Sequence, residues 1–295
     1  MRCKNRAPRH ADRPERGSCA RPGGLRPELR VSRRPAAPRE VVVRCPCWAF
    51  RVPAPLAAAT AGEARPRGWY PSHVCARYSL TAPAPQVEAF LEATAEAALR
   101  ARYNVAPGQD AAVAIRSDGG ARVLVPQRFG LEPGADGARV VNARAETAAG
   151  RPLFLDAFRC RRALVPADGF YEWRRRRDRP EPFHVTLREG GLFAMAALWQ
   201  PHAAHGAHGA RGAFAILTGP APAPLRALHD RVPILVEPAG FDAWLDPRTG
   251  VDEARALLRN ELAGSLVFRA VDPRVNDPAF DDPACLAPAP QLSLL

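Results

Sequence analysis

Four side chains that can do covalent chemistry stand far apart in this sequence: the thiol of Cys75, the amide of Asn142, the carboxylate of Glu172 and the imidazole of His229. A cysteine thiolate is a nucleophile. A carboxylate or an imidazole can move protons in such a reaction, and a neutral amide can hold a substrate. Taken singly, each has a plainer interpretation: a turn Asn, an ion-paired Glu and a structural His.

The sequence blocks around these residues follow a fixed order. They read VCARY (74–78), RYNVAP (102–107), NARAET (142–147), VPADGFYEW (165–173) and HDRVP (229–233). Together they resemble the SRAP (SOS response-associated peptidase) family, which acts on abasic sites in single-stranded DNA. The resemblance runs from Cys75 to about Asn276. It implies an enzyme of the DNA-damage response that captures its substrate covalently and needs no cofactor or metal.

The chemistry of this family places one requirement on Cys75. An abasic sugar exposes an aldehyde when its ring opens, and an α-amino group, whose pKa lies far below that of Lys, can form a Schiff base with it. The thiolate of the same residue then attacks the imine carbon and closes a thiazolidine ring. An internal Cys has no free amine and gives only a reversible hemithioacetal. The predicted function therefore requires Cys75 to be the first residue of the mature chain.

The resemblance also implies roles for the other three side chains. Glu172, flanked by aromatic residues, is expected to act as general acid and base with a pKa raised by desolvation. His229 is expected to protonate the sugar ring oxygen and so favour the aldehyde. Asn142 is expected to hold the open sugar beside Cys75.

Six residues are expected to contact DNA: Arg77, Arg144, Arg231, Thr218, Phe129 and Pro107. The three arginines each follow a proposed catalytic residue by two positions, and guanidiniums suit the phosphates that flank a lesion. Phe129 replaces a Trp that is frequent in the family and is expected to stack on bases or wedge between them.

The chain departs from the family pattern in two places. The second Trp of the family motif is missing from residues 129–135, and Ala76 replaces the usual Gly. Ala76 would strain the site if its position needed a backbone angle that only Gly adopts readily.

Residues 1–74 look unlike the rest of the chain. Residues 1–73 hold 11 Pro, and 16 Lys and Arg against 5 Asp and Glu, without a helical or strand period, which predicts disorder. Three explanations are open: translation from Val74 encoded as GTG, a propeptide removed before Cys75 by self-cleavage, or an intact leader with an inactive thiol. We expect an SRAP domain over 75–282 and a flexible tail over 283–295.

The net charge of +12 belongs to this leader, because 26 of the 42 basic and 25 of the 30 acidic residues lie beyond it. A DNA-binding face must therefore be a local patch. The apolar stretch 41–61 is interrupted by Arg and Pro and cannot span a bilayer. Cysteines without metal-site spacing indicate a reduced compartment. We expect a monomeric bacterial cytoplasmic protein, at the nucleoid when bound to DNA, with no membrane partner.

Periodicity predicts the elements that must position these side chains. Helices are predicted over 86–99, 223–229, 238–245 and 252–262. Strands are predicted over 112–116, 121–126, 163–173, 183–188, 192–199, 213–218, 233–236 and 266–271. This mixture indicates an α+β fold with a curved, barrel-like mixed β-sheet and peripheral helices.

Two other functions compete with abasic-site capture. A thiol peptidase would use Cys75 and His229 on peptide bonds, if only on its own leader, and would need no free amine. A non-catalytic single-stranded DNA-binding module would keep its affinity for DNA after Cys75→Ala and form no covalent product.

Overall fold

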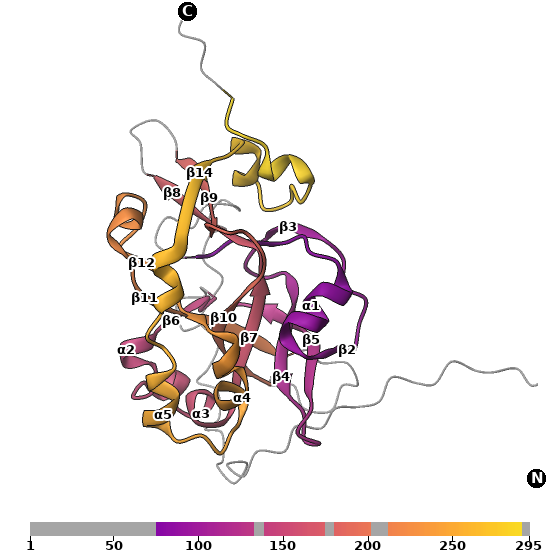
Figure 1. The fold of residues 1–295 in the computed structure, drawn as a ribbon, viewed down its shortest axis with the longest axis vertical. Coiled ribbons are helices and arrows are strands. Elements are labelled where there is room, and N and C mark those ends of the chain that lie inside the picture. Colours follow the sequence, from indigo (N-terminus) through magenta and orange to yellow (C-terminus); the bar gives the residue numbers. More distant parts are fainter. Residues whose placement is uncertain (1–74, 133–138, 175–179, 202–211, 291–295) are drawn as a thin grey trace, which may run out of the picture. The chain divides into compact units, whose positions relative to one another are not determined.

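A computed structural model describes residues 75–132, 139–174, 180–201 and 212–290 (Figure 1). The expected leader therefore lies outside the described residues, as do residues 291–295. The strands form two sheets, of five and nine strands. The first runs in the order β14 (Leu266–Ala270), β9 (Glu181–Leu187), β8 (Gly169–Arg174), β1 (Tyr78–Leu80) and β3 (Arg102–Val105).

The second sheet curves back on itself. Its path is β12 (Arg231–Pro233), β11 (Ala213–Pro220), β10 (Phe193–Gln200), β7 (Arg162–Ala167), β4 (Asp110–Arg116), β5 (Arg122–Phe129) and β2 (Thr94–Ala95), with β6 (Asn142–Arg144) beside β11 and β13 (Leu235–Val236) beside β10. A short parallel pairing of β11 with β5 links distant parts of this path. The sheet is ring-like but not a closed barrel, and the predicted α+β fold with a curved, mixed sheet is confirmed.

The central strands are buried on both faces, as β10 illustrates. Its first seven residues, 193–199, are all buried. Phe193, Met195 and Trp199 pack into the core that contains Cys75, whereas Ala194 and Leu198 pack into a second core under the helices. Because successive side chains of a strand point to opposite faces, one strand separates the two cores. Cys75 and Met195 therefore belong to the core on one side of β10.

The helices lie toward the outside of the strands (Figure 1). They are α1 (Ala84–Leu91), α2 (Ala145–Ala148), α3 (Pro152–Cys160), α4 (Phe241–Leu245) and α5 (Val251–Ala256). Short 3-10 helices are η1 (Ala223–Ala227), η2 (Pro238–Gly240), η3 (Glu261–Ser265), η4 (Pro273–Asn276) and η5 (Pro283–Leu286). Buried residues of α1, α3 and α4 contribute to the second core.

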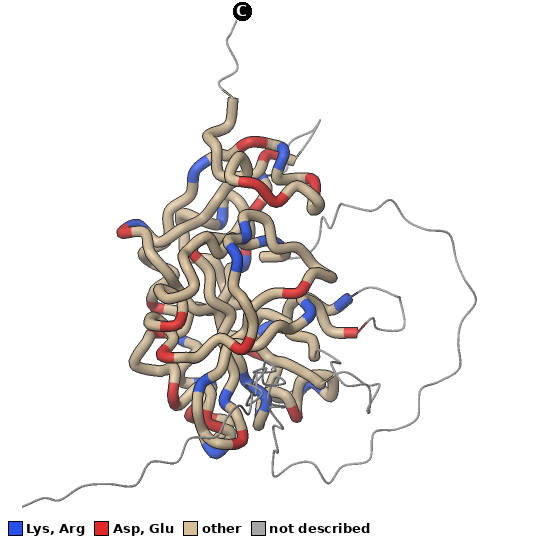
Figure 2. The backbone as a smooth tube through the Cα atoms, turned by 90° about the vertical axis from the view of Figure 1, so that its right-hand side faces the viewer, with Lys and Arg blue, Asp and Glu red and all other residues tan. Residues whose placement is uncertain are grey.

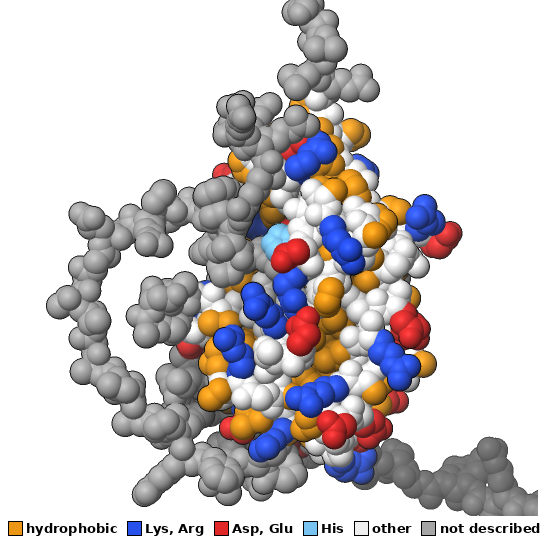
Figure 3. Space-filling view, turned by 90° about the vertical axis from the view of Figure 1, so that its left-hand side faces the viewer, with side chains coloured by type: hydrophobic (Ala, Val, Ile, Leu, Met, Phe, Trp, Pro, Cys, Tyr) orange, Lys and Arg blue, Asp and Glu red, His pale blue; other side chains and the backbone are white. Residues whose placement is uncertain are grey.

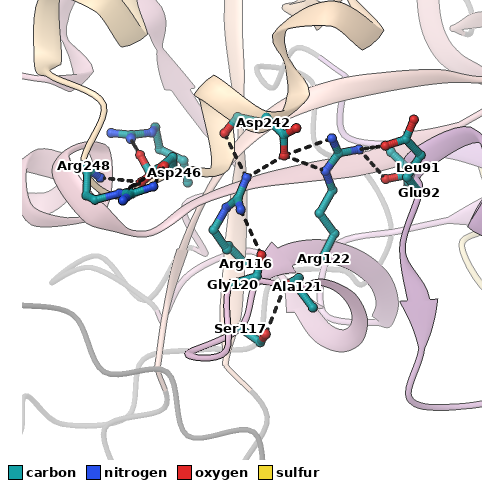
Figure 4. Close-up of polar contacts among 11 residues, drawn as sticks. Leu91, Glu92, Arg116, Ser117, Gly120, Ala121, Arg122, Asp242, Asp246 and Arg248 are labelled. Carbon is teal, nitrogen blue, oxygen red and sulfur yellow. Dashed lines mark hydrogen bonds and ion pairs between the residues drawn. The ribbon is translucent and has the colours of Figure 1, made fainter.

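Ion pairs attach α4 to the hairpin of β4 and β5 (Figure 4). Asp242 Oδ1 accepts from Arg116 at 2.6 Å and from Arg122 Nε at 3.2 Å. Arg122 also donates to the carbonyl of Leu91 at 2.7 Å, where α1 ends. The Arg122 guanidinium, followed by that of Arg116, holds the pKa of Asp242 below its usual value. Elsewhere Arg and acidic residues are interspersed along the chain (Figure 2).

Several predicted elements differ in extent from the observed ones. The strand predicted over 163–173 is two strands, β7 and β8, that belong to different sheets. The helix predicted over 86–99 ends at Leu91, because Glu92 takes a left-handed φ of 47° and β2 then pairs with β5. The tail expected from Pro283 is ordered at first: η5 buries Cys285, and Pro288 bridges to Val271. The helix predicted over 252–262 is likewise shorter, since α5 ends at Ala256.

Candidate active site

Cys75 lies beside Glu172 because of the register between β1 and β8. These strands are antiparallel, with Tyr78 facing Phe170 and Ser79 facing Gly169. Continuing that register toward the start of β1 puts Ala76 opposite Glu172, so Cys75 is its diagonal neighbour. The backbone nitrogen of Cys75 donates to Glu172 Oε1 at 2.8 Å. The nitrogen that would become the α-amine thus already contacts the candidate acid–base group.

Burial controls the protonation of this pair. Cys75 is 0% and Glu172 4% exposed. Desolvation raises the pKa of Glu172 to about 8, and the charge of Asp230 contributes in the same direction. Desolvation, followed by the charge of Glu172, also raises the pKa of the Cys75 thiol well above its usual value. Both groups are therefore mainly neutral at pH 7, in the direction that the sequence predicted for Glu172.

The thiol of Cys75 faces a methionine. Its Sγ lies 3.9 Å from Met195 Sδ, which is its hydrogen-bond partner among the residues that the structure describes. Within the described residues, no imidazole nitrogen is hydrogen-bonded to this thiol, as it would be in a Cys–His peptidase pair.

The side-chain amide of Asn142 is buried without a partner. Asn142 begins β6, which runs parallel to β11 and pairs with it at Ile216. Within the described part of the chain, neither Oδ1 nor Nδ2 has a hydrogen bond. A buried polar group left unpaired costs about 1–3 kcal/mol. The amide is thus free to bind a polar ligand.

His229 stands on the loop between η1 and β12, with 27% of its side chain exposed. The backbone N–H of Arg231 donates to His229 Nδ1 at 3.1 Å, which suits a neutral ring with its proton on Nε2. The carboxylate of Asp230 lies 2.7 Å from the same Nδ1, which suits a protonated ring. Both forms of the imidazole therefore have a partner, as a group that exchanges protons requires.

Three of the predicted DNA contacts, Arg144, Thr218 and Arg231, lie beside each other near the end of β11, where Thr218 itself is buried. Arg231 donates to the carbonyl of Thr218 at 2.6 Å, to its Oγ1 at 3.2 Å and to Glu146 at 2.8 Å. Arg144 is exposed and pairs with Thr218 in the β6–β11 register. On the face that includes these strands, basic side chains gather near a His (Figure 3).

The other predicted DNA contacts are placed differently. Arg77 is 5% exposed and donates to Asn104 Oδ1 and to the carbonyl of Val275, both at 2.9 Å. Phe129 is fully buried and stacks on Phe214 with ring centroids 5.0 Å apart. Pro107 is partly exposed after β3. In this structure the guanidinium of Arg77 and the ring of Phe129 are buried and contact other interior residues. Their contact with DNA stays a prediction.

The substitution of Gly by Ala at residue 76 places no strain on the backbone. The described residues other than Gly with a positive φ are Cys75, Glu92 and Asn260, and Ala76 is not among them. The left-handed angle falls instead on Cys75, with φ of 44°.

The described residues contain no group of three or more His, Cys, Asp or Glu side chains arranged to hold a metal ion. No helix in the same residues is both long enough and apolar enough to cross a membrane.

The family model for SOS response associated peptidase (SRAP) matches residues 74–278. The chain belongs to the SRAP family. The resemblance seen in the sequence blocks is therefore confirmed. Similar SRAP relatives include abasic site processing protein YoqW of Bacillus subtilis, 32% identical over 188 residues, or 61% of this chain and 83% of that protein. Abasic site processing protein YedK of Escherichia coli is 34% identical over 154 residues, 52% of this chain and 68% of that protein.

Solved structures share this SRAP fold. A Bacteroides thetaiotaomicron protein superposes with a TM-score of 0.62 at 20% identity, covering 73% of this chain and 100% of that protein. A phage-related protein from Bordetella bronchiseptica gives a TM-score of 0.56 at 27% identity, covering 67% and 94%.

Sequence reasoning missed several residues around the SRAP site. Met195 sits within a plain apolar strand, and only the fold brings its sulfur to Cys75. Asp168, Ser79 and His184 form a buried network behind β1 and β8. Asp168 belongs to the block that revealed Glu172, so its position in VPADGFYEW was the one available signal.

Proposed function

We propose that this SRAP protein captures abasic sites in single-stranded DNA as a covalent thiazolidine adduct of Cys75. The observation that carries the proposal is the 2.8 Å contact between the Cys75 nitrogen and Glu172 Oε1. This contact supports the proposal, because the backbone nitrogen that would become the amine and a protonatable carboxyl belong to one buried pair. The relatives named abasic site processing proteins support the substrate class and a role in the DNA-damage response.

The reaction uses Glu172 first as an acid and then as a base. The free amine adds to the aldehyde carbon and gives a carbinolamine. Glu172, protonated because its pKa is raised to about 8, donates a proton to the departing hydroxyl, so that water leaves and an iminium forms, whose nitrogen keeps its proton. The resulting carboxylate accepts the thiol proton as sulfur adds to the iminium carbon, and the nitrogen becomes the neutral N–H of the thiazolidine ring. One water is lost overall, and no redox step occurs.

Asn142 and His229 act on the sugar in this mechanism. The unpartnered amide of Asn142 binds a hydroxyl of the open sugar and regains the hydrogen bonds that it lacks without ligand. The partly exposed ring of His229 gives a proton to the ring oxygen, which opens the sugar to the aldehyde. Arg144 and Arg231 bind the flanking phosphates of the strand.

The proposal is tested with two forms of the protein, the full chain and one beginning Met-Cys75. Each is incubated with single-stranded DNA carrying one abasic site and analysed on a denaturing gel. We expect an adduct from the form whose mass shows Cys75 at its N-terminus. DNA without the abasic site is the control. An adduct from protein that retains Met1, or none from a confirmed N-terminal Cys75, would contradict the mechanism.

The arginines should separate into two classes. Arg144→Ala and Arg231→Ala should weaken binding to single-stranded DNA and lower the slope of log Kd against log salt by about 0.7 each. Arg77→Ala should instead lower the free energy of unfolding by about 2 kcal/mol, because it leaves buried acceptors unpaired. Salt titrations and chemical denaturation measure the two effects. Arg188→Ala, at an exposed turn, is the control. An unchanged salt slope for Arg144→Ala would show that Arg144 does not bind a DNA phosphate.

One observation favours a second activity, self-cleavage before Cys75. In the continuous chain Cys75 has a left-handed φ of 44°, which costs about 1–2 kcal/mol for an L-residue. Cleavage of the preceding peptide bond removes that torsion and frees the amine. Intact-mass measurement of the purified full chain over time tests this activity; a stable Met1 terminus alongside an intact fold argues against it.

A further inference from the structure

Asp168 holds the chain segment that carries Cys75. Its Oδ1 accepts from Ser79 Oγ at 2.6 Å. Its Oδ2 accepts from Thr81 Oγ1 at 2.6 Å, from the backbone N–H of Ala82 at 3.2 Å and from the backbone N–H of Thr81. The backbone N–H of Asp168 in turn donates to the carbonyl of Ser79 at 3.0 Å. One carboxylate therefore fixes both the end of β1 and the turn that follows it.

A histidine extends this contact into the first sheet. Because the Ser79 hydroxyl donates to Asp168, the proton on His184 Nε2 donates to Ser79 Oγ at 2.9 Å. His184 lies directly over Gly169: a Cβ added there would stand 2.0 Å from His184 Nε2. Gly169 is thus required for the ring to approach β8. Burial, followed by the charge of Arg269, lowers the pKa of His184 to about 4, so the ring is neutral at pH 7.

This network is not a hydrolytic triad. Ser79 is 0% and His184 4% exposed, so a substrate cannot reach the hydroxyl. The serine also stands between the other two residues, donating to the carboxylate, whereas a catalytic Ser donates to the imidazole. Its function must be structural or positional.

The spacing connects the network to the active site. Cys75 precedes Ser79 by four residues, and Asp168 precedes Glu172 by four residues. Since β1 and β8 are antiparallel, the Ser79–Asp168 contact and the Cys75–Glu172 contact lie at two ends of the same short ladder. Fixing the register at one end therefore fixes the distance between nitrogen and carboxyl at the other.

We propose that Asp168 is a positioning residue for covalent capture, holding Cys75 in register with Glu172 through Ser79 and the turn at Thr81. The inference rests on the function proposed above. β1 has only three residues, and a mature chain would begin three residues before it. Chain ends fray unless they are tied down, and a slip of one residue would turn the thiol away from the site. Asp168 supplies the contact that prevents both.

Asp168→Asn is the decisive variant, because its amide nitrogen would face backbone N–H donors or the Ser79 hydroxyl. At saturating abasic-site DNA, well below the melting temperature, we expect the rate constant for adduct formation to fall about 10- to 100-fold. The Kd for single-stranded DNA should stay within about twofold, since Arg144 and Arg231 are untouched. Asp246→Asn, which alters a carboxylate that binds the backbone N–H of Arg248 after α4, is the matched control.

A second measurement needs no DNA. Alkylation of Cys75, located by peptide mass spectrometry, should be faster in Asp168→Asn than in the unmodified protein, while alkylation of buried Cys160 stays unchanged. Gly169→Ala, which must displace His184, should give a smaller change in the same direction. Equal adduct rates for Asp168→Asn and the unmodified protein would overturn the proposal. A loss of DNA affinity or of folded structure in Asp168→Asn that accompanies the lower adduct rate would overturn it too. If the unmodified protein forms no adduct, the proposed function fails, and unchanged Cys75 alkylation then overturns the positioning role separately.

Discussion

Replacing Cys75 by Ala in a protein that begins at this residue is expected to abolish the heat-stable adduct and leave an imine that borohydride traps. The α-amine remains beside Glu172 and still condenses with the aldehyde. The thiol that closes the thiazolidine ring is gone, so the imine hydrolyses on a denaturing gel unless it is reduced. The stable adduct should fall below detection, while the borohydride-dependent band persists. Gel analysis with and without borohydride measures both.

Cys160→Ala is the matched control, since Cys160 is also a buried cysteine but belongs to α3. It should form the stable adduct at the unmodified rate. A stable adduct from Cys75→Ala would show that another nucleophile carries the reaction. Loss of the borohydride-dependent band as well would show that the amine of residue 75 does not form the imine.

Much of the fold follows from local pattern. The strands predicted near β4, β5, β7, β9, β10, β11 and β14 all exist, because β-branched and apolar runs bounded by Gly or Pro leave few alternatives. The helix over 86–99 was overextended, since an Ala-rich stretch keeps helical periodicity even where Thr94 and Ala95 pair with β5. Short strands such as β1 carry too few residues for any period, so their place depends on tertiary pairing.

The sequence predicted which residue types form the candidate site, but not the buried residues that pack around it. Glu172 contacts the backbone nitrogen of Cys75, and the catalytic roles of both residues stay a prediction. The burial of Arg77 was not foreseeable, because an Arg that satisfies buried carbonyls has the same spacing as one that binds phosphate. His184 looked like an ordinary strand residue, and only the missing Cβ of Gly169 explains its proximity to Ser79.

Glu172→Gln should slow adduct formation and raise the free energy of unfolding at neutral and higher pH. The amide cannot donate a proton to the departing hydroxyl or accept one from the thiol, so we expect the rate constant for adduct formation to fall about 10²- to 10⁴-fold. The rate for the unmodified protein should fall as the pH rises through about 8, because Glu172 loses the proton that it donates, and this fall should be absent from the variant. Single-turnover rates between pH 6 and 9.5 (the approximate range over which this carboxyl titrates) measure both. Glu181→Gln, on the neighbouring strand β9, is the control and should keep the unmodified profile.

The stability of the same variant should diverge from that of the unmodified protein as the pH rises. The raised pKa of Glu172 means that the folded state keeps a proton that the unfolded state has lost between its ordinary value of 4.5 and about 8. Unfolding releases that proton, so the unmodified protein loses stability across this window, whereas a neutral Gln does not titrate. The difference in unfolding free energy should therefore grow from near zero at pH 4.5 to on the order of 5 kcal/mol above pH 8 and then level off. Denaturation at a series of pH values measures this difference; a constant difference would mean that Glu172 is ionised in the folded protein throughout, and the acid step assigned to it would be wrong.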